Sequence, residues 1–85
     1  MVNVEETIGE IVETLNLIEQ DTTVPKNVRT KVKSALVTLM GETTISWDVR
    51  FDKVIQELDN LSEDPNLPAY TRTQIWNVMS VLESR

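Results

Sequence analysis

Two short loops decide the fold of this chain: Asp21-Thr-Thr-Val-Pro25 and Asp64-Pro-Asn-Leu-Pro68. Each loop begins with an acid, ends with a proline and interrupts a run of spaced apolar residues. A shift of 43 positions along the chain lays the first loop on the second. A period of this length is typical of a repeated supersecondary unit. The sequence therefore predicts an internal repeat, with repeat one at residues 1–42 and repeat two at residues 43–85.

Apolar residues recur at three- and four-residue spacing on both sides of each loop, as they do along one face of a helix. This spacing predicts four helices, two in each repeat. The predicted core positions are Val4, Ile8, Ile11, Val12, Leu15, Ile18, Val28, Val32, Ala35, Leu36, Leu39, Trp47, Phe51, Val54, Ile55, Leu58, Leu61, Ile75, Val78, Met79 and Leu82.

Local signals predict where these helices begin and end. Asn3 is the expected N-cap of the first helix, and Pro25 is expected in the first turn of the second. Gly41 is expected to end the second helix as a glycine C-cap. Thr44 or Ser46 is expected to cap the third helix.

Short loops force neighbouring helices to run antiparallel. Each half is then an αα-hairpin whose single apolar stripe cannot bury itself alone, so the two hairpins must stack on one another. We therefore expect an all-α fold, an up-down-up-down four-helix bundle built from two αα-hairpin repeats, in a single domain over residues 1–85.

The missing residue types exclude several classes of chemistry. The chain has no histidine and no cysteine, which removes catalytic triads, zinc sites and thiol chemistry. Its two glycines cannot form a phosphate-cradling loop. We therefore predict no enzymatic activity, no catalytic residue, no metal site and no cofactor. The rival hypothesis is an enzyme that relies on carboxylates and arginines alone.

Charge is unevenly spread along this chain of net charge −6. Residues 1–25 carry six acids and no base, whereas residues 26–41 carry four bases and no acid. This pattern indicates complementarity between neighbouring helices, and the alternative is a basic face for an anionic partner. The overall acidity argues against nucleic acid as a partner, because it repels phosphates.

Three acids at helical spacing, Glu6, Glu10 and Glu13, form a stripe on the first helix. The stripe indicates a solvated face, and the alternative is a site for a divalent ion. Because bundles that hold two metal ions add histidines to their carboxylates, the absence of histidine favours the solvated face.

The repeated pattern Asp-x3-Pro-x3-Arg places Arg29 and Arg72 one turn inside the second and fourth helices. One interpretation is structural, with the acids accepting N–H groups near a helix N-terminus and the arginines bonding to carboxylates or loop carbonyls. The other makes the arginines a symmetric pair that grips an anionic ligand or partner. Trp76 lies beside the core stripe of the fourth helix, either as a boundary residue or as an interface anchor.

The segments Asp21–Arg29, Asp64–Asn77 and Ser80–Glu83 resemble uncharacterised protein family 0147, a small archaeal group. The resemblance covers nearly the whole chain. It implies a small all-helical archaeal cytosolic protein, with a four-helix bundle of the bromodomain-like up-and-down type and no assigned activity. It supplies no catalytic or binding residue.

The functional hypothesis is a non-enzymatic protein-interaction module, with Arg29, Arg72 and Trp76 as candidate partner-binding residues. A protein partner or self-association is expected, and the alternative is weak nucleic-acid binding through the basic second helix. No signal peptide or membrane-spanning run is present, so a cytoplasmic location with no membrane contact is expected.

Overall fold

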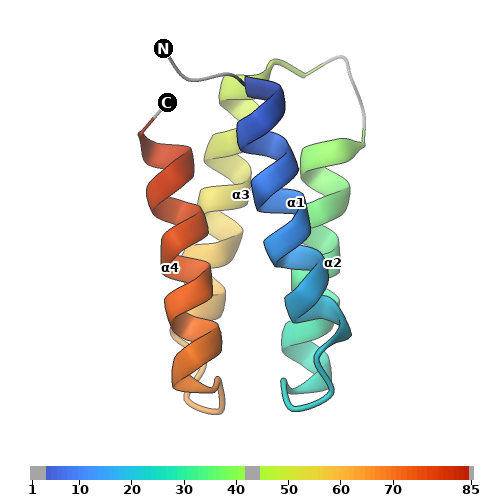
Figure 1. Cartoon of the computed structure of the whole chain (residues 1–85), viewed down its shortest axis with the longest axis vertical. Helices are drawn as coiled ribbons and strands as arrows, with labels where there is room; N and C mark the ends of the chain where they lie inside the picture. The colour runs from blue at the N-terminus through green and yellow to red at the C-terminus, as the bar shows by residue number, and fades with distance from the viewer. Residues whose placement is uncertain (1–3, 42–44, 85) are drawn as a thin grey trace.

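The computed structural model describes residues 4–41 and 45–84, and in this part of the chain it contains four helices and no strands (Figure 1). The helices are α1 (Val4–Gln20), α2 (Lys26–Met40), α3 (Trp47–Ser62) and α4 (Ala69–Glu83). None of these helices is long and apolar enough to cross a membrane.

The helices form a ring in which each packs against two neighbours. α1 lies beside α2 and α4, and α3 completes the ring on the other side, also beside α2 and α4. Figure 1 shows the α1–α2 and α3–α4 loops together at one end of the bundle. The predicted all-α four-helix bundle is therefore confirmed, whereas the internal repeat and the bromodomain-like type stay predictions.

The core follows the predicted stripes closely. The positions expected in the core are buried, with Val12, Leu36, Ile55 and Met79 half-buried against them. The prediction for Trp47 is wrong, because this residue lies at the first turn of α3 and is 40% exposed. The side chain of Val4 lies outside the described residues. The fully or nearly fully buried apolar residues of the described chain are Ile8, Ile11, Leu15, Ile18, Val24, Val28, Val32, Ala35, Leu39, Phe51, Val54, Leu58, Leu61, Leu67, Ile75, Val78 and Leu82.

Two buried loop residues, Val24 and Leu67, were not among the predicted core positions, because they lie outside the helical spacing. They are 2% and 5% exposed, and each directly precedes the proline of its loop. A residue before proline is driven into extended backbone, so its side chain leaves the helical stripe. Val24 and Leu67 belong to loops that lie at the same end of the bundle (Figure 1), and they extend the core into that end.

Pro25 lies one position earlier than predicted, and Pro68 occupies the equivalent position. Pro25 and Pro68 are the N-cap residues of α2 and α4, with ψ angles of 142° and 143° that are extended rather than helical. Their carbonyl oxygens accept the first helical bonds, from the backbone N–H groups of Arg29 and Arg72, at 3.0 Å each. A proline can serve there because an N-cap does not need its own N–H for the helix.

The N-cap of α3 is Ser46, one of its two predicted caps. Its hydroxyl oxygen accepts the N–H of Val49 at 3.4 Å. The other predicted caps, Asn3 and Thr44, lie outside the described residues.

Gly41 ends α2 as expected, but not in the expected conformation. Its φ is −81°, so it does not adopt the left-handed backbone of a glycine C-cap. Its N–H donates to the carbonyl of Val37 at 2.7 Å. A Cβ atom at this position would lie 2.5 Å from the same carbonyl oxygen. Lack of space, rather than backbone handedness, therefore favours glycine here.

The two glycines should respond to alanine in opposite directions. Gly41→Ala should lower the free energy of unfolding by about 1–3 kcal/mol, because the new methyl group collides with the backbone of α2. Gly9→Ala should raise it by about 0.5–1 kcal/mol, because a Cβ there meets nothing within 4 Å and alanine favours the helix. Urea denaturation followed by circular dichroism measures both. Equal effects of the two substitutions would contradict this description of Gly41.

Candidate functional site

The two arginines of the repeated pattern bond to the loops that precede their helices. Arg29 Nε donates to the carbonyl oxygen of Val24 at 3.1 Å. Arg72 donates twice, from Nε to the carbonyl of Ser62 and from Nη2 to the carbonyl of Asp64, at 2.9 Å each. Charge-assisted bonds of this kind are stronger than neutral ones. Both guanidinium groups therefore fasten a helix to its loop.

A third arginine, which was not predicted from the sequence, bonds to the segment that precedes α3. Arg50 is 5% exposed, and its Nε donates to the carbonyl of Ile45 at 3.0 Å. Its Nη1 lies 3.4 Å from the carbonyl oxygen of Leu39 in α2. The ring of Trp47 covers the guanidinium, 4.3 Å from Cζ to the ring centroid, which is a cation–π contact.

Arg50 could have been identified from the sequence by its position within its helix, which it shares with Arg29 and Arg72. Arg29, Arg50 and Arg72 are each the fourth residue of their helix, and the N–H of each donates to the carbonyl of the N-cap residue. A shift of 43 positions lays Arg50 on Thr7, so Arg50 is not part of the repeated pattern and a search guided by that pattern overlooks it. A search guided by helix starts finds all three.

The two loop acids accept bonds within their own loops rather than from the helices that follow. Asp21 Oδ1 accepts the N–H and the hydroxyl of Thr23 at 2.9 and 2.6 Å. Asp64 Oδ1 accepts the N–H of Asn66 at 2.8 Å. The bonds from Thr23, and secondarily the charge of Arg29, hold the pKa of Asp21 below its usual range. The acids therefore shape the loops.

A bond between the first turn of α2 and the α3–α4 loop links the two hairpins. Asn27 Nδ2, in the first turn of α2, donates to Asp64 Oδ2 at 3.4 Å. Asp64 thus joins its own loop to the hairpin formed by α1 and α2. The acids and arginines of the repeated pattern all make hydrogen bonds in or beside the two loops, which lie at one end of the bundle.

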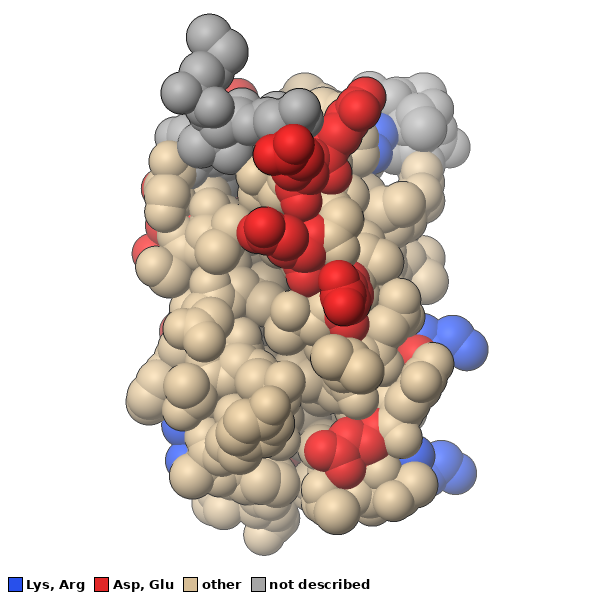
Figure 2. Space-filling model, viewed as in Figure 1, with Lys and Arg blue, Asp and Glu red and all other residues tan. Residues whose placement is uncertain are grey.

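Acidic side chains gather on α1. Figure 2 shows them running down this helix on the face turned to the viewer. Glu10 and Glu13 are exposed. Among residues 4–41 and 45–84 no group of three or more carboxylates is arranged to hold a metal ion.

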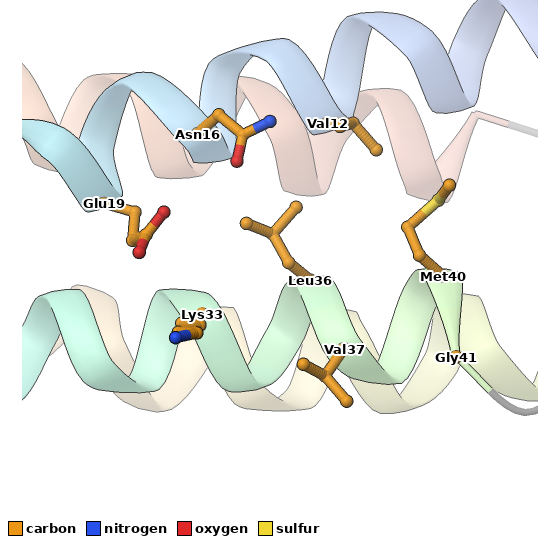
Figure 3. A pocket seen from close by; sticks show the side chains of 8 residues that line it. All are labelled: Val12, Asn16, Glu19, Lys33, Leu36, Val37, Met40 and Gly41. Atoms are coloured by element: carbon orange, nitrogen blue, oxygen red, sulfur yellow. The ribbon is translucent and has the colours of Figure 1, made fainter.

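A groove of about 460 Å³ runs between α1 and α2. Figure 3 shows Leu36 and Met40 pointing from α2 toward α1, while Val12 borders the groove from α1. Val37 and Met40 are 62% and 56% exposed. The groove is lined by Val12, Asn16, Glu19, Lys33, Leu36, Val37, Met40 and Gly41. Its walls are therefore mainly apolar, with an acid and a base at one end.

Three of the four cations of α2, namely Arg29, Lys31 and Lys33, do not share one face. Lys33 lines the groove beside α1 together with Glu19. Lys31 lines a hollow on the opposite flank of α2, together with Glu57 of α3. Arg29 is bonded to its loop. The basic helix thus lies next to acidic neighbours on both sides.

Trp76 is 54% exposed on α4, so it lies outside the core. The structure brings Arg29 and Arg72 to the same loop-bearing end of the bundle, but each guanidinium is bonded to its own loop. The three candidate partner-binding residues therefore do not form a single cluster of free side chains.

Loss of the Arg72 guanidinium should destabilise the fold. Arg72→Ala removes the donor to the carbonyl of Ser62, at the end of α3, and to that of Asp64, in the loop, and should lower the free energy of unfolding by roughly 2 kcal/mol. Arg72→Lys should recover little, because lysine cannot present two donors in a planar fork. Urea denaturation measures both variants. An unchanged denaturation midpoint for Arg72→Ala would show that the bonds do not hold the loop.

Related proteins match this chain in sequence over most of their length. The chain is 43% identical to a UPF0147 protein of Pyrococcus horikoshii over 84 residues, which is 98% of this chain and 89% of the relative. It is 45% identical to a UPF0147 protein of Methanocaldococcus jannaschii over 71 residues, which is 81% of this chain and 73% of that protein.

Two crystal structures show the same bundle. That of MMP1188, a protein of unknown function, has a TM-score of 0.92 at 40% identity and covers 100% of this chain and 96% of its own. That of a UPF0147 protein from Thermoplasma acidophilum has a TM-score of 0.87 at 36% identity, with 94% and 93% covered. The model of the uncharacterised protein family UPF0147 matches residues 1–84, so this chain belongs to that family.

Proposed function

We propose that this protein is a non-enzymatic module that binds another protein through the groove between α1 and α2. The observation that carries the proposal is the apolar wall of this groove, where Val37 and Met40 are each more than half exposed. When a partner removes exposed apolar surface from water, the free energy of the system falls, and this favours binding. The chain has no histidine or cysteine, which fits binding better than catalysis.

The shape and lining of the groove favour an amphipathic helix as the bound element. Such a helix can lay its apolar face between two parallel ridges, as in other helix-in-groove complexes. Met40 is flexible and polarisable, so it adapts to the contour of a partner. Glu19 and Lys33 at one end supply two opposite charges that can fix the orientation of the bound helix.

Nucleic-acid binding through α2 has less support. Lys31 and Lys33 lie on opposite flanks of the helix, each in a hollow that also contains a glutamate. Arg29 is bonded to the carbonyl of Val24. A duplex backbone is best met by cations aligned on one face, and these three cations do not provide one.

A pull-down from a nuclease-treated archaeal lysate tests the proposal. The Val37→Ser/Met40→Ser variant should lose the captured protein but keep its fold, because both side chains are exposed. Val49→Ser is the matched control, since Val49 is 45% exposed on α3 and does not line the groove. Trp76→Ser tests the rival interface anchor.

Capture of one protein by the native chain and by Val49→Ser, and not by the groove variant, supports the groove. Equal capture by the groove variant, with loss in Trp76→Ser, would move the interface to α4. A ligand that is captured only when nuclease is omitted would favour nucleic acid instead.

A further inference from the structure

The flank of α1 that faces α4 differs from the flank that faces α2. α1 and α4 pack less closely than any other neighbouring pair of helices. A hollow of about 360 Å³ lies on this seam near the loop end, between Leu17 of α1 and Tyr70 of α4. A smaller hollow of about 100 Å³ lies further along, between Glu10 and Val81. We call this surface the α1–α4 face.

Large apolar side chains stand exposed along the α1–α4 face. Tyr70 is 72% exposed and Leu17 is 59% exposed, and both line the larger hollow. Val81 is 36% exposed and lines the smaller one. Gln20 and Gln74 border the larger hollow and bring amide donors and acceptors. The face thus combines apolar surface with polar groups that contribute no positive charge.

The charged residues that line the two hollows are both acids, Asp21 and Glu10. α1 carries five glutamates and no cation, and α4 carries a single cation, Arg72. Arg72 is bonded to the carbonyls of Ser62 and Asp64, on the α3 side of the bundle. By contrast, α2 and α3 together carry six cations and four carboxylates. Figure 2 shows acids over α1 on the face turned to the viewer, with basic side chains visible at its edges.

Asp21 contributes less to the negative charge of the α1–α4 face than its place in the larger hollow suggests. Its carboxylate is bonded to Thr23 and lies within the field of Arg29. Of the two acids that line the hollows, Glu10 is exposed on α1 and is therefore the main source of negative charge on this face.

We propose that the α1–α4 face binds a basic amphipathic helix of a protein partner. Lysine or arginine side chains of that helix meet Glu10, and its apolar side chains pack on Leu17 and Tyr70. Glu10 and Leu17 are two helical turns apart, about 10 Å along the axis. A partner helix with a cation and an apolar residue seven positions apart therefore matches both. The ring of Tyr70 offers a further cation–π contact.

This surface goes beyond the proposed function, because the α1–α2 groove contains both an acid and a base and does not select a basic partner. The two surfaces lie on opposite flanks of α1 and share none of their lining residues. Substitutions at one should therefore leave the other intact. A protein with both surfaces can hold two partners at once.

Titration of the ¹⁵N-labelled protein with a designed 18-residue helical peptide tests the inference. The peptide carries leucines on one face and lysines on the flanks, and a matched peptide carries glutamate in place of lysine. The lysine peptide should shift the amide signals of α1 and α4 along the seam, including those of Leu17, Tyr70 and Val81. The glutamate peptide should not bind. Added salt should weaken the complex, because exposed charges are screened.

Variants separate this surface from the groove. Leu17→Ser/Tyr70→Ser and, separately, Glu10→Gln should each weaken binding of the lysine peptide by about tenfold or more. Val37→Ser/Met40→Ser should leave its affinity unchanged.

Three results would overturn the inference. These are no binding of the lysine peptide at millimolar concentration, equal binding of the glutamate peptide, and shifts confined to the α1–α2 groove. None of them bears on the pull-down that tests the groove, so the two proposals fail independently.

Discussion

Hydrogen bonds from three arginines to loop carbonyls hold this bundle together at the places where the chain enters α2, α3 and α4. Backbone carbonyls in loops and at helix ends need donors when they approach the core, and Arg29, Arg50 and Arg72 supply them. Each arginine is the fourth residue of its helix, so the bond fixes the angle between that helix and the preceding segment. With those angles set, the apolar stripes of the four helices face one core.

The guanidinium groups form hydrogen bonds within the protein, so the candidate binding surfaces lie elsewhere. The candidate arginines of the sequence analysis are engaged with their own loops, and Arg50 is buried beneath Trp47. The exposed apolar side chains lie elsewhere, and several of them line the two flanks of α1. The flank beside α2 is apolar with an acid and a base at one end, and the flank beside α4 has only acids as its charged groups. One helix can thus present two chemically different surfaces.

Sequence spacing was sufficient to predict the four helices, because burial of one stripe per helix determines which residues are apolar. It failed for Trp47, since a residue at a helix start can turn its ring outward over Arg50. It also missed Val24 and Leu67, which are buried from extended backbone. The loop arginines were visible in the repeated pattern, but their acceptors were not, because a carbonyl has no sequence signature. Grooves depend on the distance between helices, which no local pattern encodes.

The most direct test of this account is the rate at which the guanidinium Nε–H hydrogens of Arg29, Arg50 and Arg72 exchange with water, measured by ¹⁵N NMR. All three Nε–H groups donate to backbone carbonyls at 2.9–3.1 Å. The account predicts three sharp Nε–H signals that exchange much more slowly than those of free arginine. Exchange at the free-arginine rate for Arg29 and Arg72 would show that these side chains are available to a partner, and would contradict the assignment of a structural role.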